Sequence, residues 1–238
     1  MVGSLDWVCG PASALIRRAR VVAIGAALLA TACDFPTPKI YSADPITAWV
    51  VDADAGKPIE GANVLAMWEM KYGLENHGTN YAMVLEAVTD AEGRFALPGW
   101  GPRLVLKPGA VTNAAPVLTI FLPGYRVSGG ANSGVLELAP SHMKSDWDGK
   151  VFQLRRFEGT SQQYSDHLHR FLQTKIESLF SNGCNHLSLP RLLRSVDRQA
   201  RELEKQVPDS RLLNLNQLSN TFRGKCGDAE AEVGGALR

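Results

Sequence analysis

The stretch Ala87–Pro98 reads AVTDAEGRFALP and divides into a short apolar run, a turn and an alternating run. Asp90 and Gly93 bracket the turn, since an Asp side chain accepts hydrogen bonds from nearby backbone amides and Gly adopts a positive φ without strain. Arg94–Leu97 alternates large apolar side chains with small or polar ones, which is the two-residue period of a half-buried strand. The stretch therefore predicts a β-hairpin.

Extended runs of the same kind lie on both sides of this hairpin. Each is short, rich in β-branched or aromatic residues, and bounded by turn residues such as those of Asp52–Pro58 (DADAGKP). They are Ile46–Val51, Ile59–Trp68, Leu104–Leu106, Val117–Phe121 and Val151–Leu154. Because no helical pattern separates them, we expect an antiparallel β-sandwich over residues 45–157.

Several of these runs and turns, in the same order, resemble the carboxypeptidase regulatory-like domain family. The resemblance is carried by Val50–Asp52, Gly56–Ile59, Gly61–Val64, Thr89–Phe95, Leu97–Pro98 and Pro123–Tyr125. It implies a transthyretin-like sandwich. Domains of this family are mostly accessory modules without shared catalytic residues, so the resemblance implies no enzymatic activity and transfers no site residue.

The segment Glu69–Glu86 is longer than a tight connection between two strands requires. Long loops in compact domains often carry function, and Tyr72, His77 and Tyr81 are the candidate binding surface there. The alternative interpretation is a solvated loop with one helical turn and no binding role.

From Thr160 the apolar period changes to that of a helix, which predicts a helical region over residues 158–226. The first stripe consists of Tyr164, Leu168, Phe171, Leu172, Ile176, Leu179 and Phe180. Further helices are expected from Pro190 to Gln206 and from Ser210 to Phe222, followed by a flexible tail over residues 227–238. The predicted fold class is therefore α+β, a sandwich followed by a small helical bundle.

The N-terminus has the layout of a secretory signal. Arg17, Arg18 and Arg20 form a basic cluster, the uncharged apolar run Val21–Ala32 follows, and small residues precede Cys33. The run is shorter than the roughly 20 apolar residues that a spanning helix needs. A buried N-terminal helix is the alternative interpretation.

This layout is similar to the signal peptides of bacterial lipoproteins, in which small residues precede an obligatory Cys. The similarity implies removal of residues 1–32, a lipid on Cys33 that includes acyl chains such as palmitate, and a linker over residues 33–44. One departure is Ala30, where the family prefers Leu. Asp34 resembles the retention signal of enteric bacteria, which favours the inner membrane and a periplasm-facing module.

Charge and motifs narrow the possible functions. Without residues 1–32 the chain has 22 basic (25 − 3) and 23 acidic (24 − 1) residues. This charge balance does not favour binding to nucleic acid. We find no catalytic or metal-binding motif and expect a non-enzyme without cofactor that contacts an envelope protein. The alternatives are a glycan- or peptidoglycan-binding module that uses Trp68, Trp100 or Trp147, and a hydrolase whose site lies in the helical region.

Two cysteines remain after Cys9 is removed and Cys33 is lipidated, namely Cys184 and Cys226. An exported chain folds in an oxidising compartment, which favours a disulfide between them. A metal site is disfavoured, because neither residue belongs to a C-x-x-C pair.

We predict that Cys184→Ser lowers the free energy of unfolding by up to about 4 kcal/mol, because the disulfide closes a loop of 42 residues (226 − 184). Urea unfolding with and without reductant measures the change. Reductant should destabilise the wild-type protein and leave the variant unaffected, and a wild-type protein indifferent to reductant would contradict the pairing.

Overall fold

The computed structural model describes residues 39–72, 78–105, 110–111, 113–130, 139–181 and 184–208. All of them belong to one compact unit. The predicted signal peptide, Cys33 and Cys226 lie outside the described residues, as does the expected helix Ser210–Phe222. Within the described part, no helix has the length and apolar character needed to cross a bilayer.

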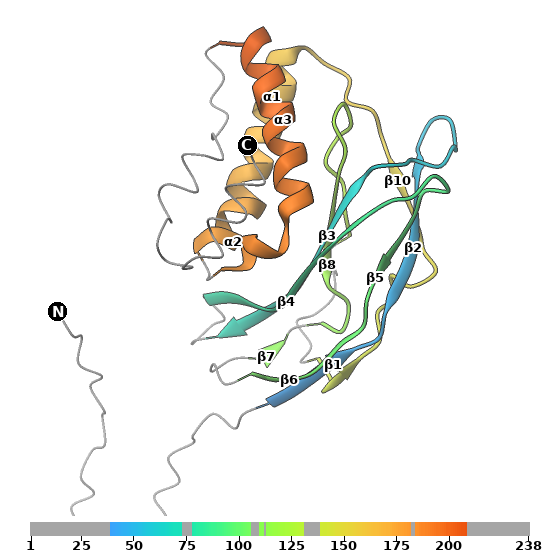
Figure 1. Ribbon diagram of the computed structural model, residues 1–238, viewed down its shortest axis with the longest axis vertical. Coiled ribbons are helices and arrows are strands. Elements are labelled where there is room, and N and C mark those ends of the chain that lie inside the picture. Colours follow the sequence, from blue (N-terminus) through green and yellow to red (C-terminus); the bar gives the residue numbers. More distant parts are fainter. Residues whose placement is uncertain are drawn as a thin grey trace, which may run out of the picture. The chain divides into compact units, whose positions relative to one another are not determined.

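The strands form three small sheets (Figure 1). In the first, β1 (Lys39–Ala43) lies between β6 (Trp100–Val105) and β9 (His142–Met143). In the second, β2 (Ile46–Asp52) lies between β5 (Arg94–Leu97) and β10 (Val151–Leu154). In the third, β3 (Asn63–Tyr72) pairs with β4 (Gly78–Val88), β7 (Ala110–Val111) and β8 (Val117–Phe121).

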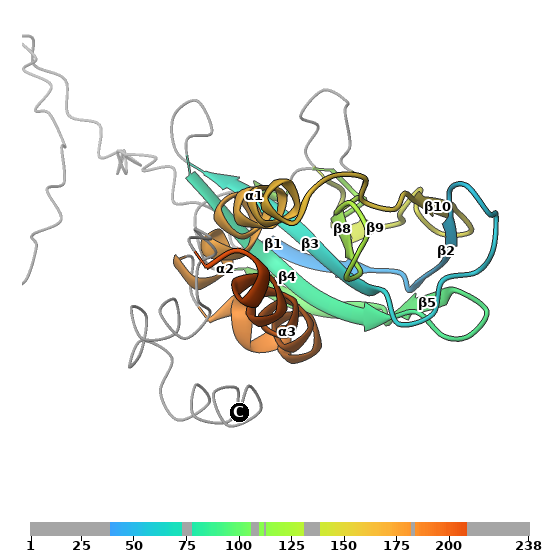
Figure 2. The ribbon, with the colours of Figure 1, turned by 90° about the horizontal axis from the view of Figure 1, so that it is seen from above.

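Helices follow the last strand and cover one face of the third sheet (Figure 2). They are α1 (Ser161–Phe171), the π-helical η2 (Leu172–Ile176), α2 (Glu177–Ser181), the 3-10 helix η3 (Asn185–Ser188) and α3 (Pro190–Gln206). Thr160 begins α1 in a capping box with Gln163, which satisfies amides that have no partner within the helix.

Strand β3 is buried on both faces because the sheet to which it belongs is covered on both sides. Its residues Val64, Ala66, Trp68 and Met70 pack into the core shared with the other two sheets. The alternate positions Leu65 and Met67 pack into a second core with the helices. A strand covered on both sides is expected to be almost continuously apolar, as this one is.

The second core joins the helices to the sheet. Phe121 of β8 stacks on Phe171 of α1 with ring centroids 5.9 Å apart and an angle of 12° between the planes. The carboxylate of Glu86 on β4 accepts hydrogen bonds from the Arg191 and Leu192 amides, each at 3.0 Å. It thereby satisfies two free amides in the first turn of α3 and places negative charge at the positive end of the helix.

The structure confirms an α+β fold with sandwich-like sheets, and α3 has the predicted bounds. The helices of the described part pack on the third sheet rather than forming a bundle apart from it. The described sheets are also not purely antiparallel, since β1 pairs with β9 and β2 with β10 in parallel. Residues 39–43 of the predicted linker form β1, because Tyr41 and Ala43 are buried against the sandwich.

The prediction of a hairpin at Ala87–Pro98 is wrong in its pairing. The turn forms, with the Arg94 amide donating to the Asp90 carboxylate at 2.7 Å. However, β4 pairs with β3 along its length, whereas β5 pairs with β2. The turn therefore joins the third sheet to the second sheet.

The prediction of a loop at Glu69–Glu86 is also wrong. Strands β3 and β4 continue through most of this segment as one antiparallel pair, from Asn63↔Val88 to Tyr72↔Gly78, with a shift in register after Trp68. The helices that cover this pair bury its apolar positions, such as Val84, so that a regular strand is favoured over an exposed loop.

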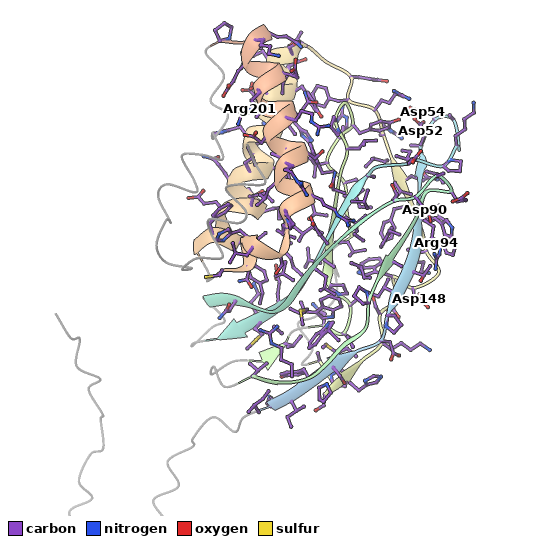
Figure 3. All side chains as sticks on the ribbon, in the orientation of Figure 1. Asp52, Asp54, Asp90, Arg94, Asp148 and Arg201 are labelled. Carbon is purple, nitrogen blue, oxygen red and sulfur yellow. The ribbon has the colours of Figure 1, made fainter. Side chains whose placement is uncertain are left out.

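Asp52, at the end of β2, fixes the turn that follows it (Figure 3). Its buried carboxylate accepts hydrogen bonds from the Ala55 and Asp54 amides, each at 3.0 Å, and from the Tyr125 hydroxyl at 2.9 Å. Those two backbone hydrogen bonds, followed by the Tyr125 bond, lower the pKa of Asp52 below its usual value. Arg156 also lies within 3.3 Å of the carboxylate.

We predict that Asp52 makes folding depend on pH in the acid range. Because its pKa is lower in the folded state, its contribution is complete above the unfolded pKa of about 3.9 and is lost as the pH falls through the folded value. The Asp52→Asn protein should unfold more easily at neutral pH. Its thermal midpoint should also fall less steeply than that of the wild type as the pH drops into the acid range. The control is Asp54→Asn on the same turn, and an acid limb unchanged by Asp52→Asn would contradict the assignment.

Candidate functional site

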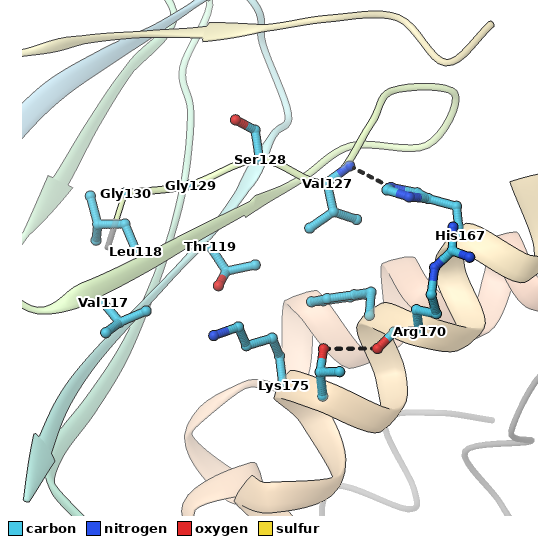
Figure 4. A pocket seen from close by; sticks show the side chains of 12 residues that line it. Val117, Leu118, Thr119, Val127, Ser128, Gly129, Gly130, His167, Arg170 and Lys175 are labelled. Carbon is cyan, nitrogen blue, oxygen red and sulfur yellow. Dashed lines mark hydrogen bonds between the residues drawn. The ribbon is translucent and has the colours of Figure 1, made fainter. Parts of the chain in front are cut away.

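A cleft of about 530 Å³ opens between the third sheet and the helices (Figure 4). We call it the sheet–helix cleft. Residues 117–119 and 127–130 line it on the sheet side. His167, Arg170, Phe171, Thr174 and Lys175 line it on the helix side. Its position follows from the fold, since the helices rest on only part of the sheet face.

The sheet side of the cleft depends on a close approach between two chain segments. The Leu118 amide donates to the Gly130 carbonyl at 2.8 Å, and the Ile120 amide donates to the Ser128 carbonyl at 2.6 Å. A Cβ atom at Gly129 would overlap the Leu118 carbonyl oxygen, so only glycine fits this position.

His167 joins the helix side of the cleft to the sheet edge. Its Nε2 accepts a hydrogen bond from the Val127 amide at 3.0 Å, which assigns the proton of the neutral ring to Nδ1. Burial, with smaller contributions from Arg170 and Arg126, lowers the pKa of His167 below its ordinary value. The ring is therefore neutral at neutral pH, and its acceptor nitrogen is already occupied.

The charged residues of the cleft are cationic. Arg170 is exposed and Lys175 is half-buried, while no lining residue has a carboxylate. Figure 4 shows the ammonium group of Lys175 and the hydroxyl group of Thr119 pointing toward each other. Lys175 belongs to η2, and short π-helical segments of this kind are frequent at functional sites.

Of the candidate surface Tyr72, His77 and Tyr81, the structure describes only the side chain of Tyr81. The half-buried Tyr81 faces the helices, where its hydroxyl group lies 2.8 Å from Ser178 Oγ, and burial raises the pKa of Tyr81. Tyr72 is the last described residue of β3, and neither its side chain nor His77 belongs to the described part. Tyr81 thus helps to hold the helices on the sheet.

The other predicted site residues lie apart from the cleft. Cys184 precedes η3, and the disulfide stays a prediction because Cys226 falls outside the described ranges. Trp68 and Trp100 are buried and meet edge to face at 5.4 Å. The half-buried Trp147 donates from its indole nitrogen to the Pro116 carbonyl at 2.8 Å.

Sequence reasoning missed the cleft because its two sides are distant along the chain. The only local sign of the cleft in the sequence is the pair Gly129–Gly130, which fits no phosphate-binding motif. In the structure this pair allows the close approach to β8. Across the ranges that the structure describes, no group of three or more His, Cys, Asp or Glu side chains gathers as a metal site would require.

Comparisons with known proteins do not identify a family. No family model and no curated protein matches the chain. Among solved structures, the dioxygenase domain of a dioxygenase–carbohydrate-binding protein fusion from Streptomyces sp. SirexAA-E is 18% identical, with 49% of this chain and 82% of that chain covered and a TM-score of 0.27.

Two further structures match at a similar level. Chlorocatechol 1,2-dioxygenase from Pseudomonas putida is 10% identical, with 49% of this chain and 60% of that chain covered and a TM-score of 0.25. A 9R-lipoxygenase from Cyanothece PCC8801 is 13% identical, with 76% of this chain and 26% of that chain covered and a TM-score of 0.26. Similarities this low do not bear on function.

We predict that His167 makes folding depend on pH between mildly acid and neutral conditions. Its folded pKa lies below the unfolded value of about 6.5, so the unfolded state binds the proton more readily and stability falls as the pH drops through this range. His167→Gln removes the titration, so the thermal midpoint should lose this part of its pH dependence. The control is His142→Gln at an exposed position, and identical profiles for His167→Gln and wild type would contradict the prediction.

Proposed function

We propose that the chain is a lipoprotein of the bacterial cell envelope, anchored through Cys33, whose folded unit is a non-catalytic accessory module that contacts an envelope protein. The observation that carries the proposal is the apolar run Val21–Ala32, which ends in small residues directly before Cys33. This pattern is typical of exported chains that are cleaved and lipidated.

The length of the tether supports a role close to the membrane. Strand β1 begins at Lys39, six residues after Cys33 (39 − 33). At no more than about 3.6 Å per residue, an anchored Cys33 would hold the start of β1 within about 22 Å of the lipid. We therefore propose that the partner is a protein at the periplasmic face of the membrane, and Asp34 favours the inner membrane.

The sandwich-like sheets support an accessory role. We propose that residues 45–157 form a transthyretin-like module of the carboxypeptidase regulatory-like kind, with β1 as an additional strand. The sheet–helix cleft supplies a concave surface for contact, lined by both apolar and polar side chains.

The alternative functions have less support from the described residues. A glycan-binding module needs exposed aromatic rings, whereas Trp68 and Trp100 are buried and Trp147 is half-buried. A hydrolase needs a base beside a nucleophile, and His167, the histidine of the cleft, uses its acceptor nitrogen for the Val127 amide.

We predict that cells fed radiolabelled palmitate incorporate the label into the wild-type protein and into Cys9→Ser, the matched control, but not into Cys33→Ser. The reason is that Cys33 is the proposed acceptor, whereas Cys9 lies in the removed segment. Intact-mass spectrometry of the purified protein should show loss of residues 1–32. An unmodified protein that keeps its first residues, or label retained by Cys33→Ser, would contradict the anchor.

A further inference from the structure

We infer that the sheet–helix cleft binds a small ligand that carries a carboxylate on an apolar body. This inference rests on the proposed role of the folded unit as a binding module, but it does not depend on the lipid anchor. Three features of the cleft support it: apolar side chains on its walls, uncompensated positive charge, and the Thr119 hydroxyl group, which bonds no other described residue.

The walls define the apolar body of the ligand. Val117, Val127 and Phe171 line the cleft, and its volume of about 530 Å³ suits a small molecule. Phe171 is held in place by its stacking on Phe121. This part of the cleft is therefore formed before any ligand arrives, which reduces the entropy lost on binding.

The charge defines the headgroup. Neither Arg170 nor Lys175 forms a salt bridge with another residue of the described ranges, and no carboxylate lines the cleft. His167 adds no charge, because burial keeps it neutral. The ammonium group of a half-buried lysine without a counter-charge attracts an anion, and the attraction is stronger beside apolar side chains than in open water.

Thr119 supplies the second donor. The residue is only 5% exposed and lines the cleft, and its hydroxyl group makes no hydrogen bond to another described residue. A threonine that lines a cleft and whose hydroxyl group is not used within the described part of the chain can donate to a ligand atom in the cleft. Together with the Lys175 ammonium, which points toward it in Figure 4, it offers one donor to each oxygen of a carboxylate.

Thr174 is not assigned as a donor to the carboxylate, because its hydroxyl group already donates to the Arg170 carbonyl at 2.8 Å. That bond lies within the turn that leads into η2 and helps to hold the segment from which Lys175 projects. Arg170 is exposed, so we assign it to the rim, where it would raise the local concentration of anions rather than fix the bound headgroup.

The test measures binding of hexanoate to the full chain by calorimetry and ligand-observed NMR. Hexan-1-ol provides the apolar body without the charge, and inorganic phosphate provides a charge without the apolar body. We expect saturable binding of hexanoate, with the other two probes at least tenfold weaker. Raising the salt concentration should weaken hexanoate binding, since part of the attraction is between charges.

Variants locate the headgroup. Lys175→Met keeps the apolar stem and removes the charge, and we expect about a tenfold loss of hexanoate affinity. Thr119→Val keeps the shape and removes the hydroxyl group, and a smaller loss is expected. Lys144→Met is the matched control at an exposed lysine outside the cleft and should bind as the wild type does. Thermal unfolding of each variant verifies that it is folded.

Three results would overturn the inference: no saturable binding of hexanoate, equal binding of hexan-1-ol or phosphate, or wild-type affinity in both Lys175→Met and Thr119→Val. These results are distinct from failure of the anchor. A chain that takes up palmitate but does not bind hexanoate refutes the assignment of the cleft alone, and a chain that binds hexanoate but takes up no palmitate refutes the anchor alone.

Discussion

Strand β3 has to be covered on both faces, and the remainder of the fold follows from that constraint. Its alternate side chains enter two different cores, one shared with the other sheets and one shared with the helices. Leaving either face in water would expose several large apolar side chains, at about 25 cal/mol for each Å² of apolar surface. The helices are thus part of the fold of the sheet rather than an addition to it.

Polar contacts fix where the helices rest. Glu86 caps the start of α3, and the Tyr164 hydroxyl accepts a hydrogen bond from the Gly124 amide at 2.8 Å. The His167 Nε2 accepts a hydrogen bond from the Val127 amide, which ties α1 to the segment beside β8. Together with the Phe121–Phe171 stack, these contacts hold the helices on the sheet, and the sheet–helix cleft lies between the two.

The sequence was informative where structure depends on local pattern. Periodicity predicted β2, β8 and α3 closely, since propensity and burial agree in each. It failed where a partner is distant. The turn at Asp90 was predicted, but its two arms pair with β3 and β2. The local pattern of Glu69–Glu86 predicts a loop, because the helices that cover this segment lie more than 70 residues later in the chain.

The candidate site could not be predicted for the same reason. Lys175 and Thr119 are 56 residues apart (175 − 119), and neither residue type is unusual in its local setting. What makes them informative is their surroundings: burial for Thr119, the lack of a counter-charge for Lys175, and the apolar walls they share. Tyr81, a candidate binding residue from the sequence, contributes instead to the internal contact with Ser178.

Native-state hydrogen exchange tests most directly whether sheet and helices form one cooperative unit. The informative amides are the slowest-exchanging ones of β3, α1 and α3, around Met67, Leu168 and Val196, all of which belong to the second core. A shared core predicts that they exchange with the same opening free energy and the same dependence on urea. Helix amides that open at a distinctly lower free energy, while those of β3 stay protected, would contradict the account.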